Sequence, residues 1–202
     1  MRHQLILIVW IVVSWQMDVI AQGCSDAGMC TISSFKPNGL THLDTTVTNL
    51  KIGINTGSAD HNISVLGNYI EYERNINRNF GINARLTSIS QSGNGISVWG
   101  LSDIFLTGKY RIWNQLNAIL GVKMPLSDAN KTKDQLPLPM DYQSSLGTID
   151  GIFGLGYAMD HIQIMVGYQR PFIQNENSFD AGRYPEGSIL RTFQTTNMYK
   201  RG

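Results

Sequence analysis

The chain has 202 residues, enough for one domain and too few for two of ordinary size. Its 16 Lys and Arg nearly balance its 15 Asp and Glu, so charge gives no reason to expect a nucleic-acid partner. Only 15% of the residues are charged, against roughly 25% in an ordinary soluble domain, and glycine is abundant, with 20 residues. This composition favours a β protein with many turns over a helical bundle.

The N-terminus has the pattern of an export signal. A basic start precedes the apolar run Leu5–Trp15, and the segment ends with the small residue Ala21. This order is typical of a secretory signal peptide. A membrane-spanning helix would need roughly 20 apolar residues, and this run is much shorter. We therefore predict a cleaved signal peptide at residues 1–21 and a mature chain that begins at Gln22.

Two cysteines follow at once, Cys24 and Cys30. An exported protein meets an oxidising compartment, so a disulfide that closes this small loop is expected. A lipidated Cys24 is the alternative, but Gln22 stands where such processing sites prefer a small residue. Two cysteines without nearby histidines are too few for a metal site. We assign residues 22–45 to a periplasmic N-terminal segment.

After residue 45, apolar and polar residues alternate with a period of two over seven segments, which predicts strands with one apolar and one polar face. In Asn62–Glu73 apolar residues occupy both sides, and the register stays open. An eighth strand is possible at Ser188–Met198. The other six segments are Thr46–Thr56, Asn79–Ser88, Asp103–Trp113, Gln115–Met124, Leu146–Met159 and His161–Gln169.

The connections between these segments alternate in length. The joins near Asn75–Asn77, at Asn114 and at Asp160 are very short, whereas Gln91–Gly100 and Pro125–Ser145 are long and polar. Outer-membrane barrels sort their loops in this way, with tight periplasmic turns and long external loops. A soluble antiparallel sandwich shows the same alternation along its strands but has no reason to sort its loops. The pattern predicts an all-β fold: an antiparallel up-and-down transmembrane β-barrel over residues 46–202.

The polar faces of the strands would then line the lumen and the apolar faces would meet lipid. The alternative is the solvated face of an ordinary soluble sheet. The charged residues expected to face the lumen are Lys51, Arg85, Asp103, Lys109, Arg111, Lys123 and Asp150.

Several stretches also carry a family resemblance. Trp99–Ile104, Gly121–Asp128 and Leu146–Asp150, together with the mature start that contains both cysteines, occur in a familiar order. Over roughly residues 22–175 the chain resembles the MetA-pathway of phenol degradation family of outer-membrane transporter-like barrels, relatives of fatty-acid and hydrocarbon uptake channels. The resemblance implies a barrel that passes small, hydrophobic molecules, and it does not specify the cargo.

The C-terminus departs from that family. Such barrels generally end on a strand with a terminal aromatic residue, whereas this chain ends in Asn197–Gly202. Seven or eight strands are also fewer than the resemblance implies, and single-chain bacterial barrels close with an even number. We therefore expect an incomplete barrel that is truncated at its C-terminus.

Motifs of catalysis are missing from the sequence. It has no Gly-x-Ser-x-Gly, no His-Glu-x-x-His and no phosphate-binding glycine loop, so we expect neither an enzyme nor a cofactor. The leading hypothesis is an outer-membrane channel or transporter whose partners are lipid and an unknown small-molecule cargo. The alternatives are a non-transporting envelope barrel (an adhesin or structural protein) and a soluble periplasmic β-sandwich binding protein.

Overall fold

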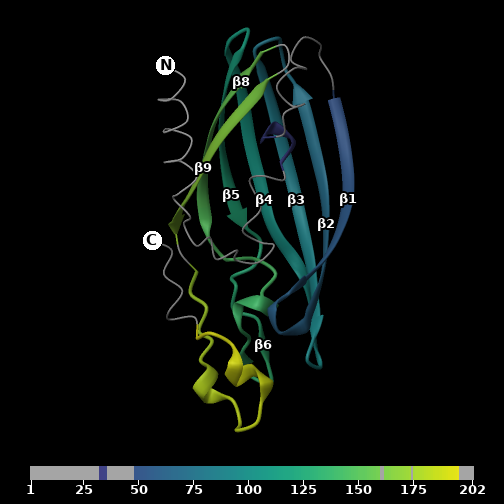
Figure 1. Ribbon diagram of the computed structural model, residues 1–202, viewed down its shortest axis with the longest axis vertical. Helices are drawn as coiled ribbons and strands as arrows, with labels where there is room; N and C mark the ends of the chain where they lie inside the picture. Colours follow the sequence, from purple (N-terminus) through teal and green to yellow (C-terminus); the bar gives the residue numbers. More distant parts are fainter. Residues whose placement is uncertain (1–31, 36–47, 160–161, 174, 196–202) are drawn as a thin grey trace, which may run out of the picture.

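The computed structural model describes residues 32–35, 48–159, 162–173 and 175–195. Its main feature is one antiparallel sheet of seven long strands that follow one another in chain order (Figure 1). These strands are β1 (Thr48–Ala59), β2 (Ile63–Asn75), β3 (Phe80–Gly93), β4 (Ile96–Trp113), β5 (Leu116–Pro125), β8 (Ile149–Ala158) and β9 (Gln163–Ile173). A small hairpin lies in the connection between β5 and β8. It pairs two strands of two residues each, β6 (Thr132–Lys133) and β7 (Leu136–Pro137).

All seven segments predicted from alternation are strands, so the all-β antiparallel fold is confirmed. The prediction of an eighth strand at Ser188–Met198 is wrong over its described part. Ile189–Thr192 forms a 3-10 helix, η6, and the hydroxyl of Ser188 accepts the backbone N–H of Leu190. Leu190 and Phe193 are both buried, and their spacing of three residues suits a 3-10 turn rather than the period of a strand.

The long loop expected at Gln91–Gly100 is also a wrong prediction. β3 and β4 continue through this stretch and meet in a two-residue turn at Asn94 and Gly95. Both turn residues have positive φ, 52° and 72°, as a type I′ hairpin requires. The serines of this stretch suggested a loop, but their backbones pair across the hairpin, and β4 reaches 18 residues.

The two ends of the sheet differ. Three short connections, β2–β3, β4–β5 and β8–β9, lie at one end, called here the short-turn end. The β1–β2 and β3–β4 hairpins, the connection 126–148 and the segment 175–195 lie at the other, the loop end. The connection 126–148 contains η4 (Met140–Tyr142), and the segment 175–195 contains η5 (Ala181–Arg183) and η6.

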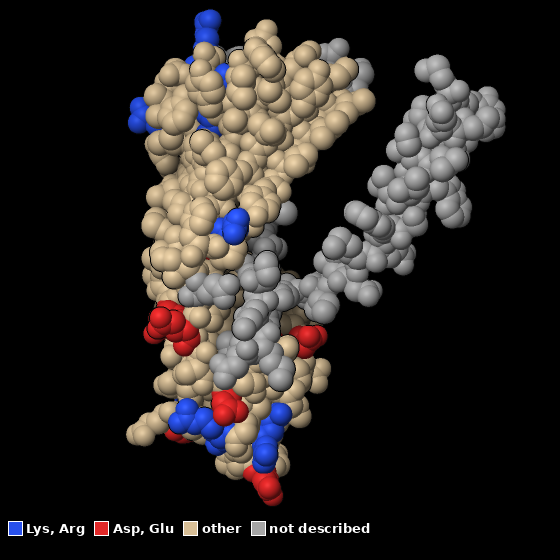
Figure 2. Space-filling view, turned by 90° about the vertical axis from the view of Figure 1, so that its left-hand side faces the viewer, with Lys and Arg blue, Asp and Glu red and all other residues tan. Residues whose placement is uncertain are grey.

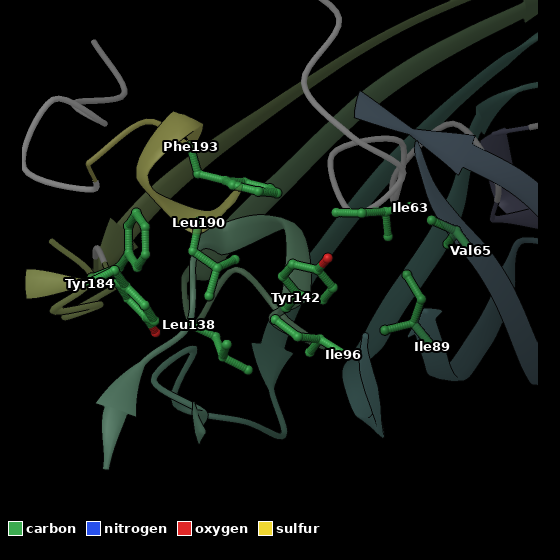
Figure 3. Close-up of a cluster of buried hydrophobic side chains, with 10 residues drawn as sticks. Ile63, Val65, Ile89, Ile96, Leu138, Tyr142, Tyr184, Leu190 and Phe193 are labelled. Atoms are coloured by element: carbon green, nitrogen blue, oxygen red, sulfur yellow. The ribbon is translucent and has the colours of Figure 1, made fainter. Parts of the chain in front are cut away.

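The connection 126–148 and the segment 175–195 pack together as a cap over the loop end. Ile63 and Ile96, from the two hairpins, join Leu138, Tyr142 and Phe193 of the cap in one buried hydrophobic cluster (Figure 3). Hydrogen bonds fix the same contact, since the Tyr142 hydroxyl donates to the carbonyl of Gly93 at 2.9 Å. The cap is therefore an ordered part of the fold.

β1 and β9 are the two edges of the sheet, and within the described residues they do not pair with each other. The sheet is consequently not closed into a barrel. The predicted signal peptide, Cys24 and Cys30 lie outside the described residues. No helix in the described part of the chain is long and apolar enough to cross a membrane.

Candidate functional site

The two faces of the sheet have the opposite polarity to those of a water-soluble protein. The face that carries Ile52, Leu120 and Val166, here the outer face, is solvent-exposed and apolar, and these side chains are 61–73% exposed. The opposite, inner face is buried and polar, with Asp103, Lys123 and Asp150 at 2% exposure or less. Alternation along each strand produces both faces at once. Other exposed apolar residues of the outer face are Leu50, Ile54, Leu66, Ile70, Tyr72, Ile82, Leu106, Tyr110, Ile112, Phe153, Leu155, Tyr157, Ile164, Tyr168 and Phe172.

Charged side chains are scarce on the outer face. Among the seven described strands, Arg74 and Arg170 carry the charges on that face, each toward one end of its strand. In Figure 2, charged residues lie at the top and in the lower part of the molecule, and apart from a basic side chain near the middle the surface between them is uncharged. Exposed tryptophans also lie far apart on β4, Trp99 toward the loop end and Trp113 at the short-turn end.

All seven residues predicted to line a lumen lie on the inner face. Arg85, Asp103, Lys109, Lys123 and Asp150 are each at most 6% exposed. The other two, Lys51 and Arg111, are partly buried. The structure gathers these residues into networks rather than spreading them over an open wall.

One network centres on Glu71 of β2. Its carboxylate pairs with the Arg85 guanidinium at 3.3 Å and accepts a hydrogen bond from the Asn83 amide at 2.6 Å. The Arg85 guanidinium also lies over the ring of Tyr69, 3.8 Å from its centroid. Glu71 was not predicted from the sequence, because apolar residues occur on both sides of its segment. The usable signal was the spacing of Leu66, Ile70 and Tyr72, which puts the odd positions of this strand on the inner face.

A second network lies nearer the loop end. The Lys123 ammonium pairs with the Asp150 carboxylate at 3.0 Å and donates to the Thr148 hydroxyl at 2.9 Å. The Gln169 amide, on β9, also donates to Asp150. On the neighbouring strand, the Asp103 carboxylate accepts a hydrogen bond from Ser145 at 2.6 Å. Because each buried charge has a partner, this face is polar without being open to water.

An N-terminal piece, η1 (Ser33–Phe35), lies against the inner face. The Ser33 backbone N–H donates to the Glu71 carboxylate at 2.9 Å, and Lys51 donates to the Ser33 hydroxyl at 2.8 Å. Phe35 enters a buried cluster, which also contains Ile32, Phe105, Ile119 and Ile152. Figure 1 shows this purple segment against the sheet. Residues 22–45 were expected only to form a periplasmic segment, and alternation along strands gives no signal for such a contact.

Gly154 of β8 makes room for that segment. A Cβ at this position would lie 2.5 Å from Cε1 of Phe35, well inside van der Waals contact. The absence of a side chain at Gly154 therefore lets the phenylalanine ring approach the strand.

The cap brings a different set of polar groups together at the loop end. The Lys131 ammonium donates to the carbonyl of Trp99 at 2.6 Å, and burial lowers the pKa of this lysine. Burial raises the pKa of Asp141, which the charge of nearby His61 partly opposes. The His61 ring stacks on Phe193 with 4.0 Å between ring centroids. These contacts hold the cap on both hairpins, through Trp99 of β4 and through His61 between β1 and β2.

No group of three or more His, Cys, Asp or Glu among the described residues is placed to hold a metal ion. In comparisons with known proteins, no family, curated protein or solved structure matches this chain. The resemblance noted above therefore rests on the quoted sequence stretches alone.

Proposed function

We propose that the chain is a β-barrel protein of the bacterial outer membrane, whose outer face meets lipid and whose inner face borders the barrel interior. One observation carries this proposal: the sheet buries its ions and exposes its aliphatic and aromatic side chains. In water, so large an apolar surface would have to be covered, because soluble monomers rarely expose more than a few hundred Å² of contiguous apolar surface. In a bilayer the same surface needs no protein cover.

Strand length and loop placement agree with this environment. The seven strands have 10 to 18 residues, and a tilted strand needs roughly 9–11 to cross a membrane. Barrels of this class place short turns in the periplasm and long loops outside the cell. The cap therefore belongs on the external side.

The role we propose first is the passage of small molecules through the barrel. The resemblance implies that these molecules are hydrophobic and does not identify them. The inner face supplies a polar wall with paired charges, as in Lys123–Asp150 and Arg85–Glu71. Ser33–Phe35 lies on that wall, so passage along it requires this segment to move.

A non-transporting envelope barrel is the second candidate, and the cap favours it. Tyr142, Phe193 and their neighbours hold the connection 126–148 and the segment 175–195 against the sheet. An ordered external end suits the binding of a partner, whereas a channel needs an open mouth. The soluble sandwich is the weakest candidate, since no described segment forms a second layer over the outer face.

Fractionation of the native protein tests the membrane assignment. We expect it in the outer membrane, with an electrophoretic mobility that changes on boiling, as closed barrels show. A soluble product with one mobility would refute the proposal. Liposome swelling with small solutes then separates the two roles, because flux above that of lipid alone supports passage and no flux supports the non-transporting barrel.

A further inference from the structure

We infer that β1 and β9 are not neighbours in the closed barrel, and that an odd number of further membrane strands, running from the loop end to the short-turn end beside each edge, separates them. This inference rests on the proposed function, since only a barrel in lipid must close. It goes beyond that proposal because it specifies the direction and chemistry of the partner strand at each edge.

The direction of the strands carries the argument. Every pair of neighbours in the seven-stranded sheet is antiparallel. Strands in odd places of the sheet order therefore run the same way, and β1 and β9 are the first and the seventh. Both run from the short-turn end to the loop end. Direct pairing of β1 with β9 would be the single parallel junction of an otherwise antiparallel sheet.

The two edges cannot simply stay open in lipid. β1 has 12 residues and β9 has 11, and both carry exposed apolar side chains along their outer face. Their unpaired N–H and C=O groups would face hydrocarbon, where no water is present to bond them. A strand on each edge is thus required by the same physics that places the outer face in the membrane.

A second copy of these seven strands does not meet the requirement. Inserted the same way up, it offers only its own β1 and β9 edges, which run in the direction already present. An inverted copy would place its cap on the opposite side of the membrane. The fitting partner is instead a segment of roughly ten residues that alternates apolar and polar side chains and runs opposite to both edges.

Cysteine cross-linking of the native protein in outer membranes tests the inference. In a background in which Cys24 and Cys30 are replaced by Ser, cysteines are introduced in pairs at Leu50, Ile52 or Ile54 on β1 and at Ile164, Val166 or Tyr168 on β9. Neighbouring strands lie about 4.8 Å apart, close enough for a disulfide, whereas an intervening strand doubles the separation. We expect none of the nine pairs to oxidise. The matched control pairs Ile52 with Ile70 and Phe153 with Tyr168, which are register partners, should oxidise.

A photoreactive benzoyl-phenylalanine in place of Ile164 or Tyr168 identifies the neighbour of β9. Both probes should couple to one peptide outside the seven strands. The Tyr168 probe should couple nearer that peptide's N-terminal side, because the partner runs antiparallel.

Three results would overturn the inference: an intramolecular β1–β9 disulfide, a disulfide-linked dimer through these edges, or coupling of the probes to lipid alone. Failure of the proposed function looks different, because the protein would then be absent from the outer membrane fraction whatever the cross-links show.

Discussion

Lys123 of β5 and Asp150 of β8 face each other as direct register partners, with 3.0 Å between the ammonium nitrogen and a carboxylate oxygen. Their side chains are only 1% and 0% exposed. Two opposite charges taken so completely out of water are stable only together, because an isolated buried charge keeps its desolvation cost without the attraction that offsets it. The pair therefore joins two adjacent strands on the inner face.

Removing one member of this pair should be strongly destabilising. For Lys123→Met we expect the free energy of unfolding to fall by about 3–5 kcal/mol, since Asp150 is left buried and without its cation. The measurement is the urea concentration at which the unboiled electrophoretic form disappears. The double variant Lys123→Met with Asp150→Leu should regain most of the loss. A single variant as stable as the wild type would show that this interior is hydrated.

The exposed pair Arg191–Glu186 provides the matched control. Its atoms are 4.0 Å apart and the Glu186 side chain is 97% exposed, so solvent screens the attraction. Arg191→Met should leave the urea midpoint unchanged.

The second prediction concerns a charge placed on the outer face. Leu120 lies on this face near the middle of β5 and is 61% exposed. Leu120→Arg should reduce stability by about 2–4 kcal/mol, because an arginine near the bilayer midplane is costly. Ile189→Arg is the control, as Ile189 is also exposed and apolar but belongs to the cap. The yield of heat-modifiable protein in the outer membrane measures both. Equal yields would place the outer face in water.

Sequence alternation was sufficient to assign the faces of six of the seven strands, because side chains on a strand must alternate; the faces of β2 stayed open because apolar residues occur on both sides of it. Lys123 and Asp150 were both placed on the polar face in this way. Their pairing was not predictable, since it depends on how β5 and β8 align across the long connection 126–148, and alternation within each strand does not fix that register.

The sequence contains a signal for the turn between β3 and β4 but none for the contact of Ser33 with Glu71. The turn at Asn94–Gly95 was present in the sequence as an Asn-Gly pair, the strongest short hairpin signal, but the polar residues around it were interpreted as one long loop at Gln91–Gly100. The contact of Ser33 with Glu71 joins residues 38 positions apart through a backbone N–H, which any residue except proline provides. No local pattern could have identified it.

Gly154 gives a third prediction about the interior. Gly154→Ala should displace Phe35, because the new Cβ would lie 2.5 Å from Cε1 of that ring. Ser34→Cys, in a background without Cys24 and Cys30, reports the movement through its rate of labelling by a maleimide. We expect labelling to be several-fold faster when Gly154 is replaced.

Gly108→Ala is the control for that substitution. Its Cβ would meet Phe80 at 3.4 Å, an ordinary contact, and the labelling rate should not change. Unchanged labelling in Gly154→Ala as well would show that Phe35 does not depend on the space at Gly154.

The last prediction concerns how the stability of the cap depends on pH. Burial raises the pKa of Asp141, so the folded cap binds a proton at this carboxyl more tightly than the unfolded chain does. Its contribution is favourable below the unfolded pKa of about 3.9 and is lost as pH rises through the higher folded value. Asp141→Asn should therefore slow hydrogen exchange in residues 126–148 at neutral pH and have little effect near pH 3. Glu176→Gln, at an exposed site in the cap, should change neither rate. Faster exchange of the Asn variant at neutral pH would mean that the Asp141 charge stabilises the cap, through its attraction to His61.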